Sequence, residues 1–198
     1  MTVIGVPLAD LWRTPAGDER VTQALLGEEV VVEEARPDGW ARVILPAQPA
    51  PSLDPRGYPG WLRAADLRPA TPAEALALAR RLMGVPYLWG GLSDAGIDCS
   101  GLVHLAWRRL GVPVPRDADD QAAAATAVPP GEERPGDLYF FARPGRRVHH
   151  VGIVAGPPPA PGDLAPMLHA CGDAGRVVEE LPKPDRVDTF AGAARLPI

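Results

Sequence analysis

The sequence predicts an α+β domain in which helices pack on an antiparallel sheet, preceded by a small all-β barrel. In the second part of the chain two helical patterns come first, and several strand patterns follow them. This order favours an antiparallel sheet with the helices packed against it. The first part instead holds short strand-like segments at close spacing, which is typical of a small barrel. The predicted helices are 71–83 and 99–110, and the predicted strands of this second part lie near 137–142, 148–155, 166–171 and 176–180.

The N-terminal part reads as short strands separated by turns. The strand-like segments are 30–32, which is β-branched, 39–44, which follows a Pro-Asp-Gly turn signal, and 58–62. A proline-rich stretch from Pro46 to Gly57 is expected to form a loop. We expect Trp40 and Trp61 to pack in the core of the barrel, rather than to stack on a ligand.

A domain boundary is predicted at the Arg68-Pro69-Ala70 step, which gives domains 1–68 and 69–198. A helix signature follows at once. Thr71 is placed as the N-cap, Pro72 occupies the first helical position, and Glu74 completes a capping box. Gly84 is placed to end this helix.

The second predicted helix begins at a cysteine. Asp98 is a plausible N-cap, so Cys99 falls in the first turn, where the helix dipole favours an anion. A thiol at such a position is expected to have a lowered pKa and to act as a nucleophile. The small Ser100 beside it leaves room for a substrate backbone. The alternative is a buried structural cysteine that performs no chemistry.

A cysteine nucleophile needs a base, and the chain contains four histidines. His104 lies on the polar face of the predicted Cys99 helix, where a surface position is expected. His149 and His150 belong to a predicted strand, and Gly152 on the same face as His150 leaves space beside that imidazole. His169 lies in a second short strand-like run.

Four motifs in one order resemble the NlpC-type cell-wall cysteine peptidases, which are papain-like. They are Pro-Tyr-Leu-Trp-Gly-Gly at 86–91, Asp-Cys-Ser-Gly-Leu-Val at 98–103, Pro-Gly-Asp-Leu at 135–138 and His-Val-Gly-Ile-Val at 150–154. The resemblance covers roughly residues 71–198. It implies that Cys99 is the nucleophile, His150 the general base and acid, and His169 the third member that orients the imidazole.

The same resemblance implies further site residues. Tyr87 matches a tyrosine near the nucleophile that assists the oxyanion site. Asp98 and Ser100 are expected to contact substrate, with the Asp98 carboxylate as a partner for a free peptide amine. Family members that recognise such an amine often carry serine where this chain has Ala118, so the amine preference is left open.

The N-terminal part resembles a bacterial SH3-like domain through Thr22-Gln23, Gly27-Glu28, Gly39-Trp40 and the segment 57–61. Tyr58 and Glu28 are similar to residues that close one end of the substrate groove in two-domain members. The implied activity is that of a γ-D-glutamyl-L-diamino-acid endopeptidase. It would cleave the γ-D-glutamyl bond to diaminopimelate or lysine in peptidoglycan stem peptides, with recycled muropeptides carrying a free N-terminal L-Ala as the expected substrates. The alternatives are a cell-wall-peptide binding protein, or an amidase or acyltransferase of the same fold.

Composition narrows the remaining choices. The net charge of −5 is spread without long runs, which argues against a nucleic-acid partner. No apolar run is long enough for a membrane helix, and no signal-like segment stands at the N-terminus, so we expect a cytoplasmic protein, or an extracellular one if a leader has been trimmed. A monomer is expected, although the sequence leaves the oligomeric state open. No cofactor is expected.

The two cysteines leave two further questions. A zinc site of Cys99, His150, His169 and Cys171 is the metal alternative, but the paired close ligand spacing typical of zinc is missing, so no metal is predicted. Cys171 is expected to be a small buried residue. Whether it pairs with Cys99 under oxidation stays open.

Overall fold

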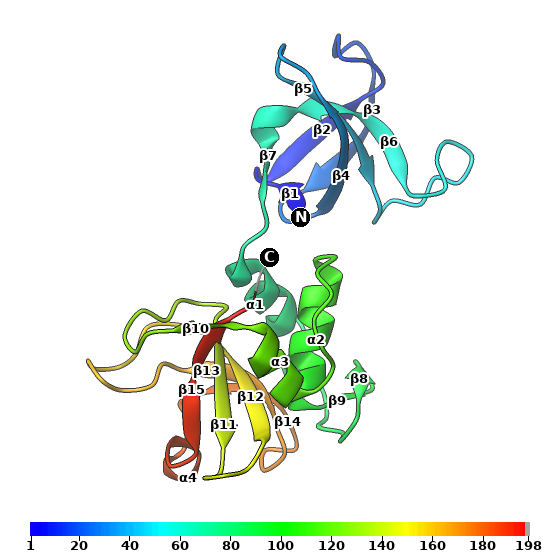
Figure 1. Cartoon of the computed structure of the whole chain (residues 1–198). Helices are drawn as coiled ribbons and strands as arrows, with labels where there is room; N and C mark the ends of the chain where they lie inside the picture. The colour runs from blue at the N-terminus through cyan, green and yellow to red at the C-terminus, as the bar shows by residue number, and fades with distance from the viewer. Residues whose placement is uncertain (197–198) are drawn as a thin grey trace. The chain divides into compact units, whose positions relative to one another are not determined.

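The computed structural model describes residues 1–196 (Figure 1). The chain divides into two units, Met1–Ala70 and Thr71–Ile198. The division falls after Ala70 because the last strand of the first unit, β7, pairs with its first strand, β1.

The first unit is a curled antiparallel sheet in the strand order β3-β2-β6-β5-β4-β1-β7. Its strands are β1 (Thr2–Ile4), β2 (Leu8–Trp12), β3 (Arg20–Leu25), β4 (Glu29–Ala35), β5 (Trp40–Leu45), β6 (Tyr58–Arg63) and β7 (Leu67–Pro69), with a 3-10 turn η1 (Ala64–Asp66) before β7. Apolar side chains from β1 to β6, among them Leu11, Val43 and Leu62, form its core. The all-β, SH3-like character predicted for this part is confirmed.

The position predicted for Trp61 is wrong. Alternation along β6 buries Gly60 and Leu62, which leaves Trp61 half-buried beside the guanidinium of Arg36, 5.5 Å from the ring centre. Trp40 is buried as expected, and the guanidinium of Arg63 lies over its ring at 3.9 Å.

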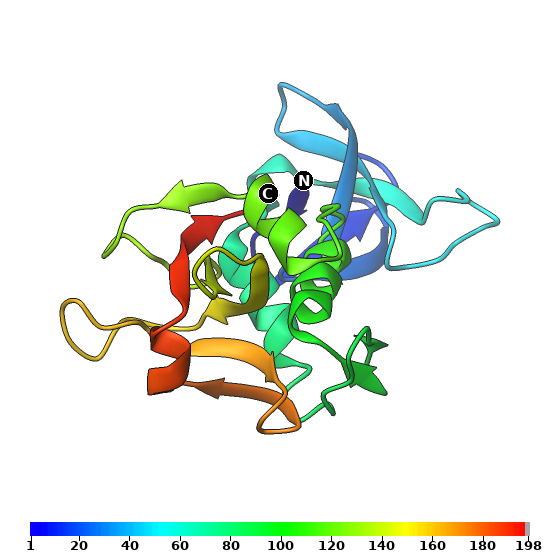
Figure 2. The same ribbon diagram turned by 60° about the horizontal axis from the view of Figure 1, so that its bottom comes forward.

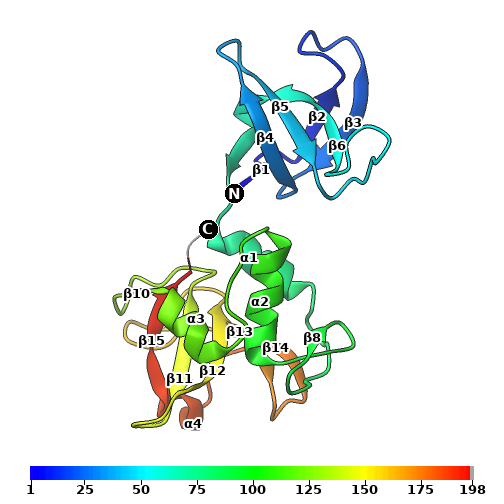
Figure 3. The same ribbon diagram turned by 45° about the vertical axis from the view of Figure 1, so that its right-hand side comes forward.

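The second unit begins with the predicted capped helix. α1 (Pro72–Arg80) has the Thr71–Glu74 capping box, and the chain turns through Gly84 at a φ of +83°. The other helices are α2 (Cys99–Arg109), α3 (Ala118–Ala124) and α4 (Pro184–Val187). Figures 1 and 3 show α1 and α2 side by side, packed against the sheet.

The sheet of this unit has six antiparallel strands in the order β10-β15-β11-β12-β13-β14. They are β10 (Thr126–Val128), β11 (Leu138–Ala142), β12 (Val148–Val154), β13 (Met167–Cys171), β14 (Arg176–Glu180) and β15 (Phe190–Arg195). Figure 2 shows β13 and β14, in orange, as neighbours at one edge. Helices on an antiparallel sheet form the predicted α+β papain-like fold, so the predicted fold class is confirmed.

Several elements of this unit were not predicted. A two-stranded ribbon, β8 (Leu92–Ser93) with β9 (Gly96–Ile97), precedes α2, and β15 enters the sheet beside β11. The carboxylate of Asp137 is fully buried and accepts two hydrogen bonds from Arg195, at 2.6 and 2.8 Å. This ion pair fixes the end of β15 to the start of β11.

Among residues 1–196, no helix is both long enough and apolar enough to span a membrane.

Candidate active site

The start of α2 is held by its own N-cap. The Asp98 backbone is extended, and its carboxylate accepts a hydrogen bond from the Gly101 N–H at 2.7 Å. A Cβ on Gly101 would lie 2.4 Å from the Gly91 carbonyl oxygen, so only glycine allows the preceding loop to approach this turn. These contacts fix Cys99 in the first turn of the helix, as the sequence predicts.

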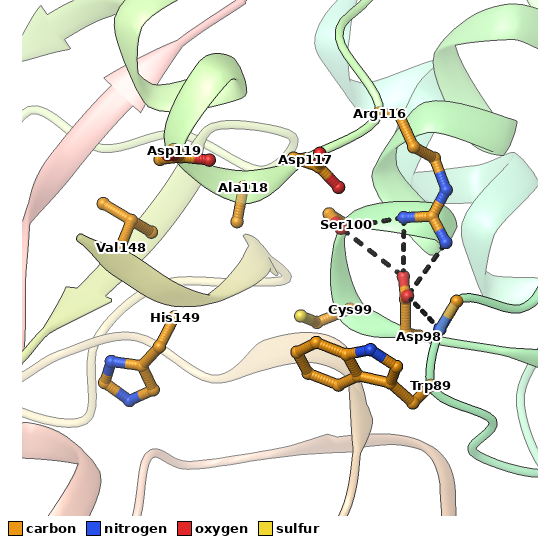
Figure 4. Close-up of a pocket in the computed structure, with 11 residues that line it drawn as sticks. Trp89, Asp98, Cys99, Ser100, Arg116, Asp117, Ala118, Asp119, Val148 and His149 are labelled. Atoms are coloured by element: carbon orange, nitrogen blue, oxygen red, sulfur yellow. Dashed lines mark hydrogen bonds and ion pairs between the residues drawn. The ribbon is translucent and has the colours of Figure 1, made fainter.

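Asp98 also forms a bidentate ion pair with Arg116, with nitrogen–oxygen distances of 2.9 and 2.8 Å. Hydrogen bonds from the Gly90 N–H and the Ser100 hydroxyl bring the total on this carboxylate to five. Figure 4 shows those from Arg116, Gly90 and Ser100. The carboxylate is therefore committed to organising the loop and the helix start. Its expected contact with a substrate amine stays a prediction.

Cys99 is 6% exposed, and burial raises the pKa of its thiol above the usual value of 9.0. The Asp98 carboxylate also raises this pKa, while hydrogen bonds from the backbone of Val151, Ser100 and Cys99 lower it. The lowered pKa expected from the helix N-terminus is therefore wrong for the free protein, because desolvation outweighs the backbone dipoles.

Strand β12 contacts this cysteine through the residue that follows its His150. β12 pairs with β13 only at Ile153–Leu168 and Val154–Met167, so the two strands separate toward His150. In this opening the backbone of Val151 hydrogen-bonds toward the Cys99 sulfur. The residue next to His150 is therefore in direct contact with the predicted nucleophile.

His150 and His169 form a buried pair. His150 Nε2 lies 2.8 Å from His169 Nδ1, and the two rings meet edge to face at 4.9 Å between centroids. Because Nε2 of His150 is engaged by His169, Nδ1 is the nitrogen left for a proton from a thiol. His149 is exposed and lines the cleft, so of the two adjacent histidines only His150 joins the pair.

Both imidazoles are neutral at neutral pH. Burial, with Arg186 and His169 nearby, holds the pKa of His150 well below its usual range. Burial, with Arg186 and Lys183, lowers the pKa of His169 to about 3. The resting site therefore holds a neutral thiol and two neutral imidazoles, which suits proton transfer at the moment of attack.

A cleft of about 470 Å³ opens over the cysteine. Figure 4 shows Cys99 between Trp89 and Ser100, with His149 across the cleft. The lining residues are Trp89, Gly90, Asp98, Cys99, Ser100, Arg116, Asp117, Ala118, Asp119, Val148 and His149. Three carboxylates against one guanidinium give this lining an acidic balance.

Two further predicted residues lie in this neighbourhood. Burial raises the pKa of the Tyr87 hydroxyl, and Cys99, Asp98 and Cys171 add to that rise. The phenol ring is within van der Waals reach of Gly172, where a Cβ would lie 3.8 Å from it. The Ser100 hydroxyl accepts a hydrogen bond from Arg116 at 3.0 Å.

Tyr58 and Glu28 belong to the first unit. The Glu28 carboxylate accepts hydrogen bonds from the Gln48 amide at 2.9 Å and from the Leu25 N–H at 3.0 Å. Tyr58 lines a hollow of the barrel together with Trp61 and Arg13. Their predicted contact with substrate stays a prediction.

One group of side chains in the site could hold a metal ion. His169, Cys171 and Glu180 offer ligand atoms that all lie within 4.8 Å of one another. This set shares only His169 and Cys171 with the four-residue zinc alternative raised by the sequence. Both cysteines are free thiols.

A buried cysteine at a helix start, a histidine pair on an antiparallel sheet and an open cleft define a papain-like cysteine peptidase. The family comparison is specific: the NlpC/P60 family matches residues 84–187, a segment that contains Cys99, His150 and His169. The chain belongs to the NlpC/P60 family. Residues 11–48 match the bacterial dipeptidyl-peptidase SH3 domain.

Three curated relatives match this chain over different shares of its length. The γ-D-glutamyl-L-lysine dipeptidyl-peptidase of Bacillus subtilis is 29% identical over 68% of this chain and 69% of its own length. The Bacillus cereus protein of the same name is 26% identical over 93% of this chain and 77% of its own. The peptidoglycan endopeptidase RipB of Mycobacterium tuberculosis is 40% identical over 48% of this chain and 41% of its own.

Solved structures agree on the fold. A Bacillus cereus NlpC/P60 family protein superposes with a TM-score of 0.58 at 22% identity, covering 99% of both chains. The NlpC/P60 domain of the peptidoglycan hydrolase SagA superposes with a TM-score of 0.53 at 25% identity, covering 64% of this chain and all of that one.

Proposed function

We propose that this chain hydrolyses peptidoglycan stem peptides at the bond between γ-D-glutamate and the diamino acid. The observation that carries the proposal is a buried Cys99 at a helix start that lines an open cleft and is hydrogen-bonded by Val151, whose neighbour His150 forms a buried pair with His169. The substrate class is supported by the relatives, which are named for γ-D-glutamyl-L-lysine dipeptidyl-peptidase and peptidoglycan endopeptidase activities.

The reaction begins with general-base catalysis. Nδ1 of His150 accepts the Cys99 proton while the sulfur attacks the γ-carbonyl carbon of D-glutamate. The backbone N–H of Cys99 stabilises the oxyanion, with the hydroxyl of Tyr87 as a second donor. The C–N bond then breaks, and the His150 imidazolium gives its proton to the departing amine of the diamino acid.

A thioester between Cys99 and the γ-glutamyl group remains. Water attacks this thioester with His150 again acting as base, which frees the carboxylate product and restores the thiol. His169 keeps the His150 ring oriented through both halves of the reaction, as the third group does in such triads. Because His169 is neutral, it stabilises the imidazolium less than a carboxylate would.

The acidic cleft favours a substrate that carries an ammonium group. Asp117 is exposed in the cleft and makes no capping hydrogen bond to α3, so its carboxylate is available to a cation. Asp98 is already paired with Arg116. We therefore infer that a free N-terminal L-Ala amine is bound on the Asp117 side, where Ala118 replaces the serine common in the family.

The finer proposal is a cytoplasmic, monomeric enzyme that trims recycled muropeptides. From the resemblance to two-domain members, Tyr58 and Glu28 are proposed to contact the substrate, and short free peptides are proposed to be preferred over intact wall. A requirement for the free amine is the property that separates such a trimming enzyme from one that acts on cross-linked wall.

The test is hydrolysis of L-Ala-γ-D-Glu-meso-diaminopimelate and of its lysine counterpart, followed by mass spectrometry. Each peptide is also supplied with an N-acetylated terminus, and Cys99→Ala is the control. We expect release of L-Ala-D-Glu from the free peptides only, with loss in the variant. Cleavage of both forms would remove the amine requirement. No cleavage of either form would overturn this substrate assignment.

A further inference from the structure

The outer nitrogen of the histidine pair ends against a carboxylate. His169 is fully buried, and its Nε2 makes no hydrogen bond within residues 1–196. Glu180 Oε1 lies 3.4 Å from this nitrogen, within ion-pair distance but without hydrogen-bond alignment. A buried N–H left unpaired is costly, so an acceptor at this position has a large effect on which nitrogen carries the proton.

The register of the β13–β14 pair places Glu180 beside His169 Nε2. In the antiparallel β13–β14 pair, Met167 lies opposite Glu180 and His169 lies opposite Val178. Side chains of Glu180 and His169 therefore share one face of the sheet as diagonal neighbours. The adjacent Glu179 points to the other face, where Arg80 binds it at 2.8 Å.

The proton positions of the two rings are linked. For His150 to accept the Cys99 proton at Nδ1, its own ring proton must be on Nε2. That N–H then donates to His169 Nδ1 across 2.8 Å, so His169 must carry its proton on Nε2. In the opposite arrangement His169 donates from Nδ1, and His150 Nδ1 is protonated and unable to act as a base.

We propose that Glu180 is a positioning residue: it accepts the Nε2–H of His169 and so holds both imidazoles in the proton arrangement that leaves His150 Nδ1 free to take the Cys99 proton. The site is then a chain of four groups, from the Cys99 thiol through the two rings to a carboxylate. Its catalytic consequence rests on the proposed function, whereas the proton arrangement itself does not.

Solvent exposure suits Glu180 to this role. Its side chain is 32% exposed, so the carboxylate keeps part of its hydration while one oxygen faces the buried ring. The proposed role requires this side chain to turn so that Oε1, now 3.4 Å away, aligns with the Nε2–H. His169 stays neutral in this arrangement, so the contact with Glu180 creates no charge on this fully buried ring.

The direct test is long-range ¹H–¹⁵N correlation NMR of the full-length protein at pH 7, which reports the protonated nitrogen of each neutral ring. The chain has four histidines, and single replacements assign their signals. We expect Nε2–H for His150 and His169 in the wild type and in Glu180→Gln, which keeps an acceptor oxygen. In Glu180→Ala we expect both rings to shift toward Nδ1–H. The proposal would be overturned if both rings kept the Nε2–H tautomer in Glu180→Ala, or if they lost it in Glu180→Gln.

Kinetics provide the second readout. Glu180→Ala should lower kcat by roughly 10-fold or more with little change in KM, and Glu180→Gln should restore most of it. Glu179→Ala is the matched control on the opposite face and should keep the wild-type tautomers. A fall in kcat that Glu180→Gln does not restore would count against the role. If the wild type cleaves neither peptide, the proposed function fails, while the NMR result still decides the role of Glu180.

Discussion

The two buried histidines predict that acid destabilises the second unit. An unfolded histidine titrates near pH 6.5, whereas folding lowers the pKa of His169 to about 3 and that of His150 well below its usual range. Below about pH 6.5 the unfolded chain therefore binds more protons than the folded one, so stability falls as pH falls.

The magnitude follows from this difference. One histidine that titrates only when unfolded costs ~1.4 kcal/mol of stability per pH unit below 6.5, which amounts to ~2 kcal/mol between pH 7 and pH 5. His169 supplies this full amount because its folded pKa of about 3 lies below the whole interval. His150 contributes at most the same amount, so the total loss of stability between pH 7 and pH 5 is about 4 kcal/mol.

Cysteine labelling isolates the unit concerned. The chain has two cysteines, both buried in the second unit, so a Cys99→Ser protein has Cys171 as its single reporter. Urea unfolding is followed by pulsed labelling of Cys171 with a disulfide reagent that reacts at acid pH. His169→Gln should remove ~2 kcal/mol of the pH 7-to-5 loss, and the parent should show no change between pH 7 and 8. An equal pH 7-to-5 loss in parent and His169→Gln would refute the reasoning.

Three further predictions concern the same unit. Asp137→Ala should destabilise it by about 2 kcal/mol, because the variant removes the buried carboxylate that accepts two hydrogen bonds from Arg195, while the guanidinium left behind keeps some solvent; urea unfolding measures this. Gly101→Ala should lower the free energy of unfolding by about 2 kcal/mol and should also lower kcat, since the new Cβ would lie 2.4 Å from the Gly91 carbonyl oxygen and displace the helix start. Urea unfolding measures the first effect and peptide hydrolysis the second. The rate at which iodoacetamide alkylates Cys99 in the free protein should keep rising with pH above pH 9.0, because burial raises the pKa of the thiol.

Each of these has a result that would contradict it. Wild-type stability in Asp137→Ala would mean that the ion pair with Arg195 contributes nothing. Full activity in Gly101→Ala would mean that the loop does not press on the helix start. A plateau in Cys99 alkylation below pH 8 would indicate a resting thiolate paired with an imidazolium, and so contradict the neutral resting site.

Helix caps and strands that depend on a short stretch of sequence were predictable. The Thr71 and Asp98 caps follow from short capping patterns, and both are present. The β-branched strand that carries His150 was predicted from alternation alone. By contrast, the sequence of β15, Phe-Ala-Gly-Ala-Ala-Arg, has little strand preference of its own. This strand is held by its pairing with β11 and by the contact of Arg195 with Asp137, and both form only in the folded sheet.

The electrostatics of the site depend on tertiary burial. The Cys99 pKa was predicted with the wrong sign because the helix start is visible in sequence, while its 6% exposure is not. Glu180 was missed for a related reason. The strands at 166–171 and 176–180 were predicted, but their register was not worked out across the turn, and the register alone puts Glu180 diagonal to His169.

The central claim is that Cys99 forms a thioester with the γ-glutamyl group of the substrate. The measurement that tests it most directly is cleavage of the lysine and diaminopimelate tripeptides in the presence of hydroxylamine, with products weighed by mass spectrometry. A common acyl-enzyme predicts L-Ala-D-Glu hydroxamate beside the free acid, in the same ratio for both substrates. Cleavage without hydroxamate, or a ratio that changes with the departing diamino acid, would contradict the account.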